Sequence, residues 1–485
     1  MRNTMKLQEL LQNADMAYKN LINEDALNTE ITDISFDTRT VGKGSVFVCI
    51  KGIRSDRHEY IEDAVAKGAS VIVSEYPADT KNAVNIVVEN TNAALSCLAA
   101  AFYQNPQKKL RMIGVTGTNG KTTVTNLVKN MLEVCGYKVG LIGTNEIVID
   151  KTSYPANATT PEAPELFSHL KKMADENCDF AVMEVSSHSV SLGRVAAIHF
   201  EIGVFTNLTQ DHLDYHITME NYADAKAAFF RQCDIAVINQ DSPYSETMKA
   251  QATGKVVTYG LDDGCDFCAK DIEYRADGVT YTVIHEKDPY TVKLPIPGGF
   301  SVYNSLAVCA MSGALSVPDG FVRMAMKKSK TVKGRCELVE IDKPYQVMID
   351  FAHTPDGMEN ILTSVNEFKP ARVITVFGCG GDRDKGKRPQ MGAIAKKYSD
   401  VVVVTSDNPR SEDMQAIIDD IMAGIPDQTN VYSHTDRKEA IRLAMELAQK
   451  DDIVLLLGKG HEMVQKFKDY EIEFDEREVV KSLCN

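Results

Sequence analysis

One stretch of the chain constrains its fold more than any other. The sequence IGVTGTNGKTTVTNLVKNMLEV (113–134) places an apolar run before a glycine-rich loop and an amphipathic segment after it. In that segment apolar residues recur at helical spacing, at Val124, Leu127, Val128, Met131 and Leu132. The order predicts a buried strand, a tight turn and a helix, as at the start of an α/β domain with a parallel sheet.

The same loop predicts a nucleotide site. Glycines let backbone N–H groups surround a phosphate, and the helix N-terminus adds partial positive charge. Lys121 can reach the terminal phosphates, and the Thr122 hydroxyl can bind Mg²⁺. Five residues separate Gly114 from Gly120, where the common phosphate-binding loop has four. The competing interpretation is therefore a plain strand-to-helix turn with a solvated lysine.

Alternating strand-like and helix-like runs divide the chain into three blocks. Polar breaks at NPQKKL (105–110) and KSKTVKGRCE (328–337) separate them. We predict an α/β protein with a central, doubly wound, mostly parallel sheet that carries the phosphate loop and a small antiparallel annex, and with a C-terminal Rossmann-like domain. The predicted domains are residues 1–108, 109–333 and 334–485.

Charge and cysteine content exclude some classes of protein. Lys and Arg number 53 against 68 Asp and Glu, a net charge of −15. This balance argues against a nucleic-acid or anionic-membrane binder. The start of the chain has no apolar core of signal-peptide length, and the 11 cysteines are an odd, scattered set. Both features predict a cytoplasmic protein with reduced cysteines. Cys265 and Cys268 lack a second pair at zinc spacing, which disfavours a metal or redox role.

Polar residues also follow two strand-like runs downstream of the loop. Glu184 ends FAVME, and Asp211 and His212 follow FTNLTQ. Doubly wound sheets hold ligands at such strand ends, although each could be only a cap or turn. Lys226 falls on the apolar face of a predicted helix, where an unpaired ammonium is costly. From the residues alone, a lysine stem that reaches the surface is the favoured explanation.

GVTGTNGKTT resembles the ATP-binding loop of the Mur ligase family, and the resemblance extends along nearly the whole chain. These enzymes form amide bonds in the cytoplasmic synthesis of peptidoglycan precursors. The resemblance implies an ADP-forming acid–amino-acid ligase that works through an acyl phosphate. It also implies ATP, Mg²⁺ and a CO₂-derived carbamate on Lys226 as cofactors. The implied catalytic residues are Lys121, Lys226 and His212, and the implied metal ligands are Thr122, Glu184, His212 and carbamylated Lys226.

Further positions match the family's substrate sites. The implied ATP contacts are Gly117, Thr118, Asn119, Gly120, Lys121, Thr122, Thr123, Asn304, Arg335 and Asp350. The implied contacts with a UDP-sugar peptide are Thr159, Thr160, Ser186 and Arg194. A threonine–proline turn would explain the two threonines of ATTPE equally well.

ISFDTRT (34–40) and DNPR (407–410) are similar to the branch of the family that adds the third amino acid, meso-diaminopimelate, to UDP-N-acetylmuramoyl-L-alanyl-D-glutamate. There the planar fork of Arg410 would bind a distal carboxylate that L-lysine lacks. The implied amino-acid contacts are Arg383, Asp407, Asn408, Arg410, Gly458 and Glu462.

Three alternatives remain beside this interpretation. They are a form that adds L-lysine, a ligase similar to folylpolyglutamate synthase, and a nucleotide-dependent switch. The switch lacks an Asn-Lys-x-Asp guanine signature in this sequence. The expected partners are small molecules, with no nucleic acid and no membrane insertion, and a monomer is expected.

Overall fold

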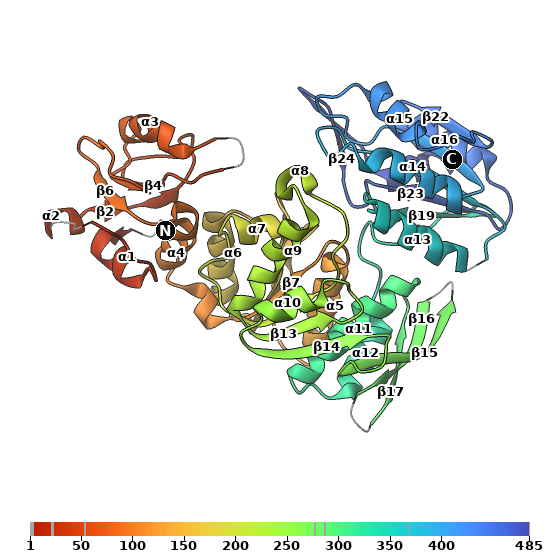
Figure 1. The fold of residues 1–485 in the computed structure, drawn as a ribbon, viewed down its shortest axis with the longest axis horizontal. Coiled ribbons are helices and arrows are strands. Elements are labelled where there is room, and N and C mark those ends of the chain that lie inside the picture. Colours follow the sequence, from red (N-terminus) through yellow and green to blue (C-terminus); the bar gives the residue numbers. More distant parts are fainter. Residues whose placement is uncertain are drawn as a thin grey trace.

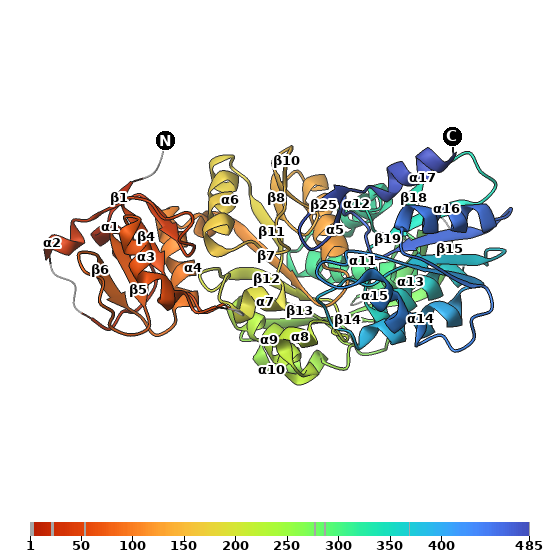
Figure 2. The same ribbon diagram turned by 90° about the horizontal axis from the view of Figure 1, so that it is seen from above.

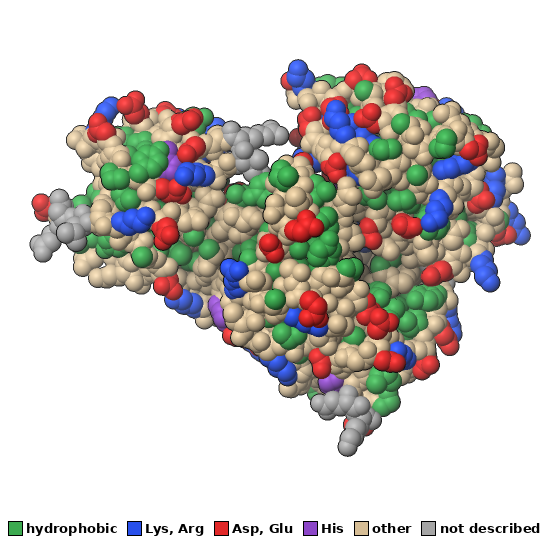
Figure 3. All heavy atoms as spheres, viewed as in Figure 1, with side chains coloured by type: hydrophobic (Ala, Val, Ile, Leu, Met, Phe, Trp, Pro, Cys, Tyr) green, Lys and Arg blue, Asp and Glu red, His purple; other side chains and the backbone are tan. Residues whose placement is uncertain are grey.

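The computed structural model describes residues 4–20, 24–52, 55–275, 278–285, 288–367 and 369–484. The chain forms three α/β domains, as predicted, with the N-terminal and C-terminal domains on either side of the central one (Figures 1 and 2). Figure 3 shows the two outer domains as separate lobes, with acidic and basic side chains interspersed over that face. The predicted boundaries at 108 and 333 stay predictions.

The N-terminal domain contains a four-stranded parallel sheet in the order β3-β4-β5-β6. The four strands of this sheet are β3 (Asp33–Ser35), β4 (Ser45–Val48), β5 (Val71–Ser74) and β6 (Val84–Val87). The domain also has a separate antiparallel pair, β1 (Met5–Lys6) and β2 (Glu30–Ile31). Its helices are α1 (Leu7–Asn13), α2 (Glu24–Leu27), the 3-10 helix η1 (Arg57–Tyr60), α3 (Ile61–Ala66) and α4 (Thr91–Phe102). The polar break that follows is a 3-10 turn, η2 (Pro106–Lys109), in which Gln107 is buried, so it is not a loose linker.

The central domain is built on an 11-stranded sheet in the order β10-β9-β8-β11-β7-β12-β13-β14-β15-β16-β17. Its strands are β7 (Arg111–Thr116), β8 (Val139–Ile142), β9 (Glu146–Ile149), β10 (Thr152–Pro155), β11 (Phe180–Glu184), β12 (Phe200–Phe205), β13 (Cys233–Asn239), β14 (Lys255–Gly260), β15 (Phe267–Arg275), β16 (Gly278–Ile284) and β17 (Tyr290–Leu294). Pairing from β8 to β15 is parallel, whereas β8–β10 and β15–β17 pair antiparallel. The predicted annex therefore extends the main sheet, and its residues 276–277 and 286–287 lie outside the described residues.

Successive side chains of each strand point to opposite faces of this sheet, so apolar residues lie on both faces. Helices cover both of them. In β11, Met183 packs into one hydrophobic cluster and Val182 into the other. The helices of the domain are α5 (Lys121–Val134), α6 (Ala163–Asp175), α7 (Ser187–Ser191), α8 (Leu213–His216), α9 (Met219–Ala227), η3 (Ala228–Gln232), α10 (Ser245–Gln251), α11 (Gly299–Ala314) and α12 (Asp319–Lys328).

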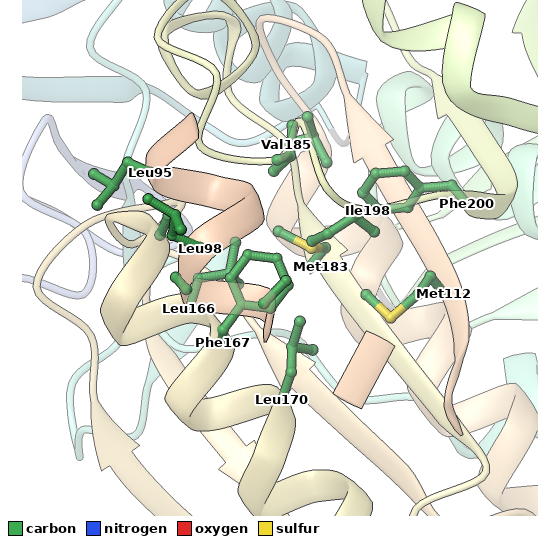
Figure 4. Close-up of a cluster of buried hydrophobic side chains, with 14 of the residues drawn as sticks. Leu95, Leu98, Met112, Leu166, Phe167, Leu170, Met183, Val185, Ile198 and Phe200 are labelled. Carbon is green, nitrogen blue, oxygen red and sulfur yellow. The ribbon is translucent and has the colours of Figure 1, made fainter. Parts of the chain in front are cut away.

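The N-terminal and central domains share a hydrophobic core. Leu95 and Leu98 of α4 lie against Leu166 and Phe167 of α6 (Figure 4), and all four side chains are buried. This packing holds the N-terminal domain against the central sheet.

The C-terminal domain has a six-stranded sheet in the order β18-β19-β23-β20-β21-β22, parallel except for β18. Its strands are β18 (Glu337–Val339), β19 (Gln346–Asp350), β20 (Val373–Phe377), β21 (Val401–Thr405), β22 (Val431–His434) and β23 (Ile453–Leu457), with a separate hairpin of β24 (Val464–Lys466) and β25 (Glu471–Glu473). Its helices are α13 (Pro355–Glu367), α14 (Lys387–Tyr398), α15 (Met414–Met422), α16 (Arg437–Leu447) and α17 (Glu476–Cys484).

Two further observations concern the whole chain. In the part that the structure describes, no helix is long and apolar enough to cross a membrane. All 11 cysteines are free thiols, and Cys268 Sγ donates to the backbone oxygen of Cys265, 3.2 Å away.

Candidate active site

Loops that follow strands of both large sheets meet in one cleft between the central and C-terminal domains. They follow β7, β11 and β12 in the central domain, and β19, β20, β21 and β23 in the C-terminal domain. The carboxyl ends of parallel strands share one edge of a sheet, where doubly wound folds bind ligands. The cleft holds a cavity of about 330 Å³ and a smaller one of about 100 Å³. The two are continuous, because both are lined by Asn119, Gly120, Thr122, Arg335 and Phe351.

The phosphate loop has the predicted form: β7, a glycine turn and then α5. Gly117 and Gly120 have φ of +148° and +87°, backbone angles that residues with a Cβ rarely adopt. Lys121 Nζ donates to the backbone oxygens of Gly117 (2.9 Å) and Thr118 (2.8 Å). Burial in the cleft lowers the pKa of Lys121, Glu184 opposes this effect, and Arg335 adds to it. Lys121 of the loop and Arg335, which precedes β18, therefore bring two cations to the cleft.

Glu184 lies at the end of β11, directly beside the loop. It is 1% exposed and accepts hydrogen bonds from the Thr122 hydroxyl (3.0 Å) and from the backbone and hydroxyl of Thr144 (2.8 and 2.9 Å). Hydroxyl and carboxylate oxygens are the ligands that Mg²⁺ prefers. Among the described residues, no group of three or more His, Cys, Asp or Glu side chains could hold a metal. Thr122 and Glu184 thus fit an ion that takes its other ligands from phosphate and water.

Lys226 of α9 is fully enclosed, so the interpretation that its stem reaches the surface is wrong. The side chain is 1% exposed, and Nζ donates to the backbone oxygen of Gly117 at 2.9 Å and lies 4.8 Å from the centre of the Tyr222 ring. Burial lowers its pKa well below the usual value, and Lys121 adds to this effect. No described carboxylate forms an ion pair with it. Lys226 therefore places a buried amine at the back of the phosphate loop.

Two histidines flank Asp211 in the cleft. Nε2 of His212 lies 3.4 Å from the Asp211 carboxylate, and Nε2 of His353, from the C-terminal domain, lies 3.9 Å from it. His353 Nδ1 lies 2.9 Å from the backbone oxygen of Phe351, so the Nδ1–H tautomer leaves the Nε2 lone pair toward the cleft. Burial lowers the pKa of both histidines, and Asp211 opposes this effect.

The smaller cavity collects the other residues predicted for ATP. Asn304 of α11 is 6% exposed, and Thr123 and Asp350 are also buried. Arg335 donates to the Thr122 hydroxyl at 3.3 Å and lies over the Phe351 ring at 4.6 Å, while its buried Nε has no partner among the described residues. Apolar walls with a few fixed polar groups are typical of a nucleotide-base pocket.

The residues predicted for the sugar peptide lie on the other side of Glu184. Thr159 lines the main cavity and accepts a hydrogen bond from Thr144 at 3.0 Å. Thr160 is 1% exposed, and its hydroxyl donates to the backbone oxygen of Glu184 at 2.9 Å and to Ser186 Oγ at 3.3 Å. Arg194 lines a neighbouring cavity of about 400 Å³ at the N-terminal domain, which shares Asp214 and Arg383 with the main cavity, and it pairs there with Glu162.

The residues predicted for the amino acid converge at the C-terminal wall of the cleft. Arg383, Asp407, Asn408, Arg410, Gly458 and Glu462 all line the main cavity. Arg410 Nη1 donates to the backbone oxygen of Gly381 at 2.6 Å. Burial lowers the pKa of Arg410, and the nearby Arg383 adds to this effect. Neither guanidinium forms an ion pair with a carboxylate of the described residues. Two adjacent guanidiniums that lack such a partner form a site for an anion.

Three residues in this region were not predicted from the sequence. Asp356, in the first turn of α13, accepts a hydrogen bond from Asn119 at 2.8 Å and so joins the C-terminal domain to the phosphate loop. Thr144 donates hydrogen bonds to both carboxylate oxygens of Glu184. Lys459 donates hydrogen bonds to the side chains of Asn408 and Glu462. In sequence Asp356 looks like any acid in the first turn of a helix, whereas Lys459 lies in GKGHE, a motif whose flanking residues alone were assigned.

Comparison with known proteins gives the same family for all three domains. Residues 30–103 match the model described as "Mur ligase family, catalytic domain", residues 115–312 match "Mur ligase middle domain", and residues 334–460 match "Mur ligase, glutamate ligase domain".

Relatives match over nearly the full length. A UDP-N-acetylmuramoyl-L-alanyl-D-glutamate–2,6-diaminopimelate ligase from Clostridioides difficile is 43% identical over 98% of both chains. The protein of the same name from Caldanaerobacter subterraneus subsp. tengcongensis is 45% identical over 94% of this chain and 95% of its own. A solved structure of a ligase with that name matches with a TM-score of 0.70, 30% identity and 99% of both chains covered.

Proposed function

The chain belongs to the Mur ligase family, and we propose that it joins meso-2,6-diaminopimelate to UDP-N-acetylmuramoyl-L-alanyl-D-glutamate at the expense of ATP. One observation carries the choice of amino acid. Arg383 and Arg410 lie together in the cleft without a carboxylate partner among the described residues. Arg410 is half-buried and Arg383 is exposed. A half-buried guanidinium that loses a charged hydrogen-bond partner on the ligand costs about 1.5–3 kcal/mol. This pair therefore favours an amino acid with a second carboxylate over L-lysine.

Each side chain has a task in the reaction that follows from its position. The substrate carboxylate and the γ-phosphate of ATP are both anions, so their approach needs cations. Lys121 and Arg335 supply positive charge at the phosphate loop, and the amides of the loop bind phosphate oxygens. Attack of the carboxylate on phosphorus gives ADP and an acyl phosphate. The amine of the amino acid then attacks the acyl carbon and phosphate leaves.

The amine must lose a proton to attack. His353 presents its Nε2 lone pair toward the cleft from the C-terminal domain, beside Asp211. Glu462 offers an acceptor for the distal ammonium of diaminopimelate, Asn408 orients Glu462 through its amide, and Arg410 offers its guanidinium to the distal carboxylate. The meeting of two domains at one site keeps water from the acyl phosphate.

The chain fits magnesium and a modified lysine. When bound, Mg²⁺ would neutralise charge on the phosphates, and Thr122 and Glu184 would hold it. A carbamate on Lys226 would replace the buried amine by an anion, and His212 lies in the same region of the cleft. The enclosed amine with its lowered pKa supports this modification.

The test is phosphate release by the purified protein with ATP, Mg²⁺ and the UDP-sugar dipeptide. Parallel reactions receive meso-diaminopimelate, L-lysine or L-glutamate, and the product mass is measured. We expect turnover with diaminopimelate. Arg410→Met should lower kcat/KM for diaminopimelate roughly a hundredfold, because a bidentate charged contact is worth about 3 kcal/mol.

Arg442→Met is the matched control, since Arg442 lies on α16 with a half-exposed side chain paired to Glu439 and Glu446. It should leave turnover unchanged. A preference for L-lysine would overturn the choice of amino acid. Turnover with L-glutamate alone would overturn the choice of substrate class.

A further inference from the structure

Arg383, Asp407, Asn408, Arg410, Gly458 and Glu462 form the amino-acid corner of the cleft. Lys459 lies directly behind this corner, in the loop between β23 and β24. Its side chain is 0% exposed and does not line the cavity. The ammonium donates to Asn408 Oδ1 (3.1 Å), Glu462 Oε2 (3.0 Å) and the backbone oxygen of Val464 (2.7 Å). An ammonium has three protons, so these three acceptors satisfy it completely.

Lys459 thereby fixes the two side chains that do line the cavity. Asn408 donates its amide to the same oxygen of Glu462 at 2.8 Å, and its own oxygen also accepts the backbone N–H of Lys466 at 2.9 Å. Glu462 Oε2 is thus occupied by two donors from the protein. Its Oε1 is the oxygen left to face a ligand.

The buried ammonium also sets the charge of the corner. Arg383, Arg410 and Lys459 are cations, whereas Asp407 and Glu462 are anions, so these five groups sum to +1. Without Lys459 they would sum to zero. Diaminopimelate carries two ammoniums and two carboxylates and is neutral overall, whereas lysine carries a net charge of +1 at neutral pH. A corner with excess positive charge disfavours lysine by like-charge repulsion.

We propose that Lys459 is a positioning and specificity-determining residue of the amino-acid site. It orients Asn408 and Glu462 from behind, and its charge selects a neutral diamino diacid over a cationic diamino acid. This inference rests on the proposed function, because it concerns how that function's amino acid is chosen.

The test compares Lys459→Met, Lys459→Gln and the wild type in the phosphate-release assay, with KM measured separately for each substrate. Lys459→Met should raise KM for diaminopimelate about tenfold or more, since charged hydrogen bonds are lost. KM for ATP and for the UDP-sugar dipeptide should stay within about twofold. The ratio of kcat/KM for diaminopimelate over L-lysine should fall in both variants, including Lys459→Gln, which keeps a donor but removes the charge.

Lys468→Met is the control with the same change of charge. Lys468 is exposed in the connection between β24 and β25, and its loss should change neither KM nor the ratio. A double variant tests the route of the effect. If Lys459 acts through Glu462, Lys459→Met combined with Glu462→Gln should lose less than the sum of the two single losses.

Each outcome decides the inference. An equal rise of all three KM values in a folded Lys459→Met protein would show a general structural role and overturn it. An unchanged amino-acid ratio or additive losses would overturn it as well, while diaminopimelate turnover by the wild type would leave the proposed function standing. Wild-type protein without diaminopimelate turnover would overturn both.

Discussion

Replacing Gly120 by alanine should weaken nucleotide binding by more than its backbone strain explains. Gly120 lies at the N-terminus of α5 with φ of +87°. An alanine in this region costs about 1–2 kcal/mol. An added Cβ would also lie 2.4 Å from Asn304 Oδ1, far inside van der Waals contact. Asn304 is 6% exposed and lines the nucleotide pocket, so it must move within that pocket.

The other end of the same helix provides the control. Gly136 follows the C-cap of α5 with φ of +91°, and an added Cβ there would have no other described residue, apart from its chain neighbours, within 4 Å. Gly136→Ala therefore carries the same strain without the contact. The difference between the two variants isolates the displacement of Asn304. A lost hydrogen bond of about 1–1.5 kcal/mol corresponds to roughly five- to tenfold weaker binding.

Calorimetric titration with ADP measures the binding, and urea unfolding measures the strain. Both variants should lose similar stability, about 1 kcal/mol, because alanine also reduces the entropy of the unfolded chain and offsets part of the strain. Only Gly120→Ala should bind ADP five- to tenfold more weakly. Equal weakening in both variants, or unchanged binding by Gly120→Ala, would refute the argument from Asn304.

Three other changes have defined outcomes. With ¹³C-bicarbonate, the wild type should give a carbamate signal in ¹³C NMR that is absent from Lys226→Ala and fades on acidification, because CO₂ reacts only with the unprotonated amine. Arg388 lowers the pKa of Glu412 from 4.5 to about 2, so this carboxylate contributes stability above pH 4.5 that is lost as pH falls toward 2. Glu412→Gln should therefore cost about 1–3 kcal/mol at neutral pH and flatten the fall of Tm over that window; an unchanged slope would contradict the assignment. Phe167→Ala, in the core shared by the first two domains, should cost about 3–5 kcal/mol in urea unfolding, and a loss below about 1 kcal/mol would show that this core is not tightly packed.

Local patterns were predicted well because local forces decide them. The strand, glycine turn and helix around Lys121 depend on residues within one short segment, and β7 and α5 have the expected form. The strand that ends at Glu184 was predicted for the same reason, since apolar runs of strand length are buried on both faces of a parallel sheet. Glu184 and the phosphate loop meet because the carboxyl ends of parallel strands lie at one edge of a sheet.

Side-chain environments were harder to predict, because they depend on partners far away in sequence. Lys226 looked like a surface-reaching lysine, and only the packing of α9 behind the phosphate loop shows that its amine contacts Gly117, 109 residues away. The antiparallel pair β9–β10 at one edge of the central sheet was not predicted either.

The sequence by itself determined the α/β class, the phosphate loop, the resemblance to the family and most residues that line the cleft. The tertiary structure decided which of those residues are positioned by hydrogen bonds, and which distant residues make those bonds. Asn119 and Asp356 meet across two domains, and Lys459 supports Asn408 and Glu462 from behind a wall of the cavity. The reason is physical: a motif specifies backbone shape through nearby residues, whereas burial, charge balance and hydrogen-bond partners arise only when distant strands are brought to one edge.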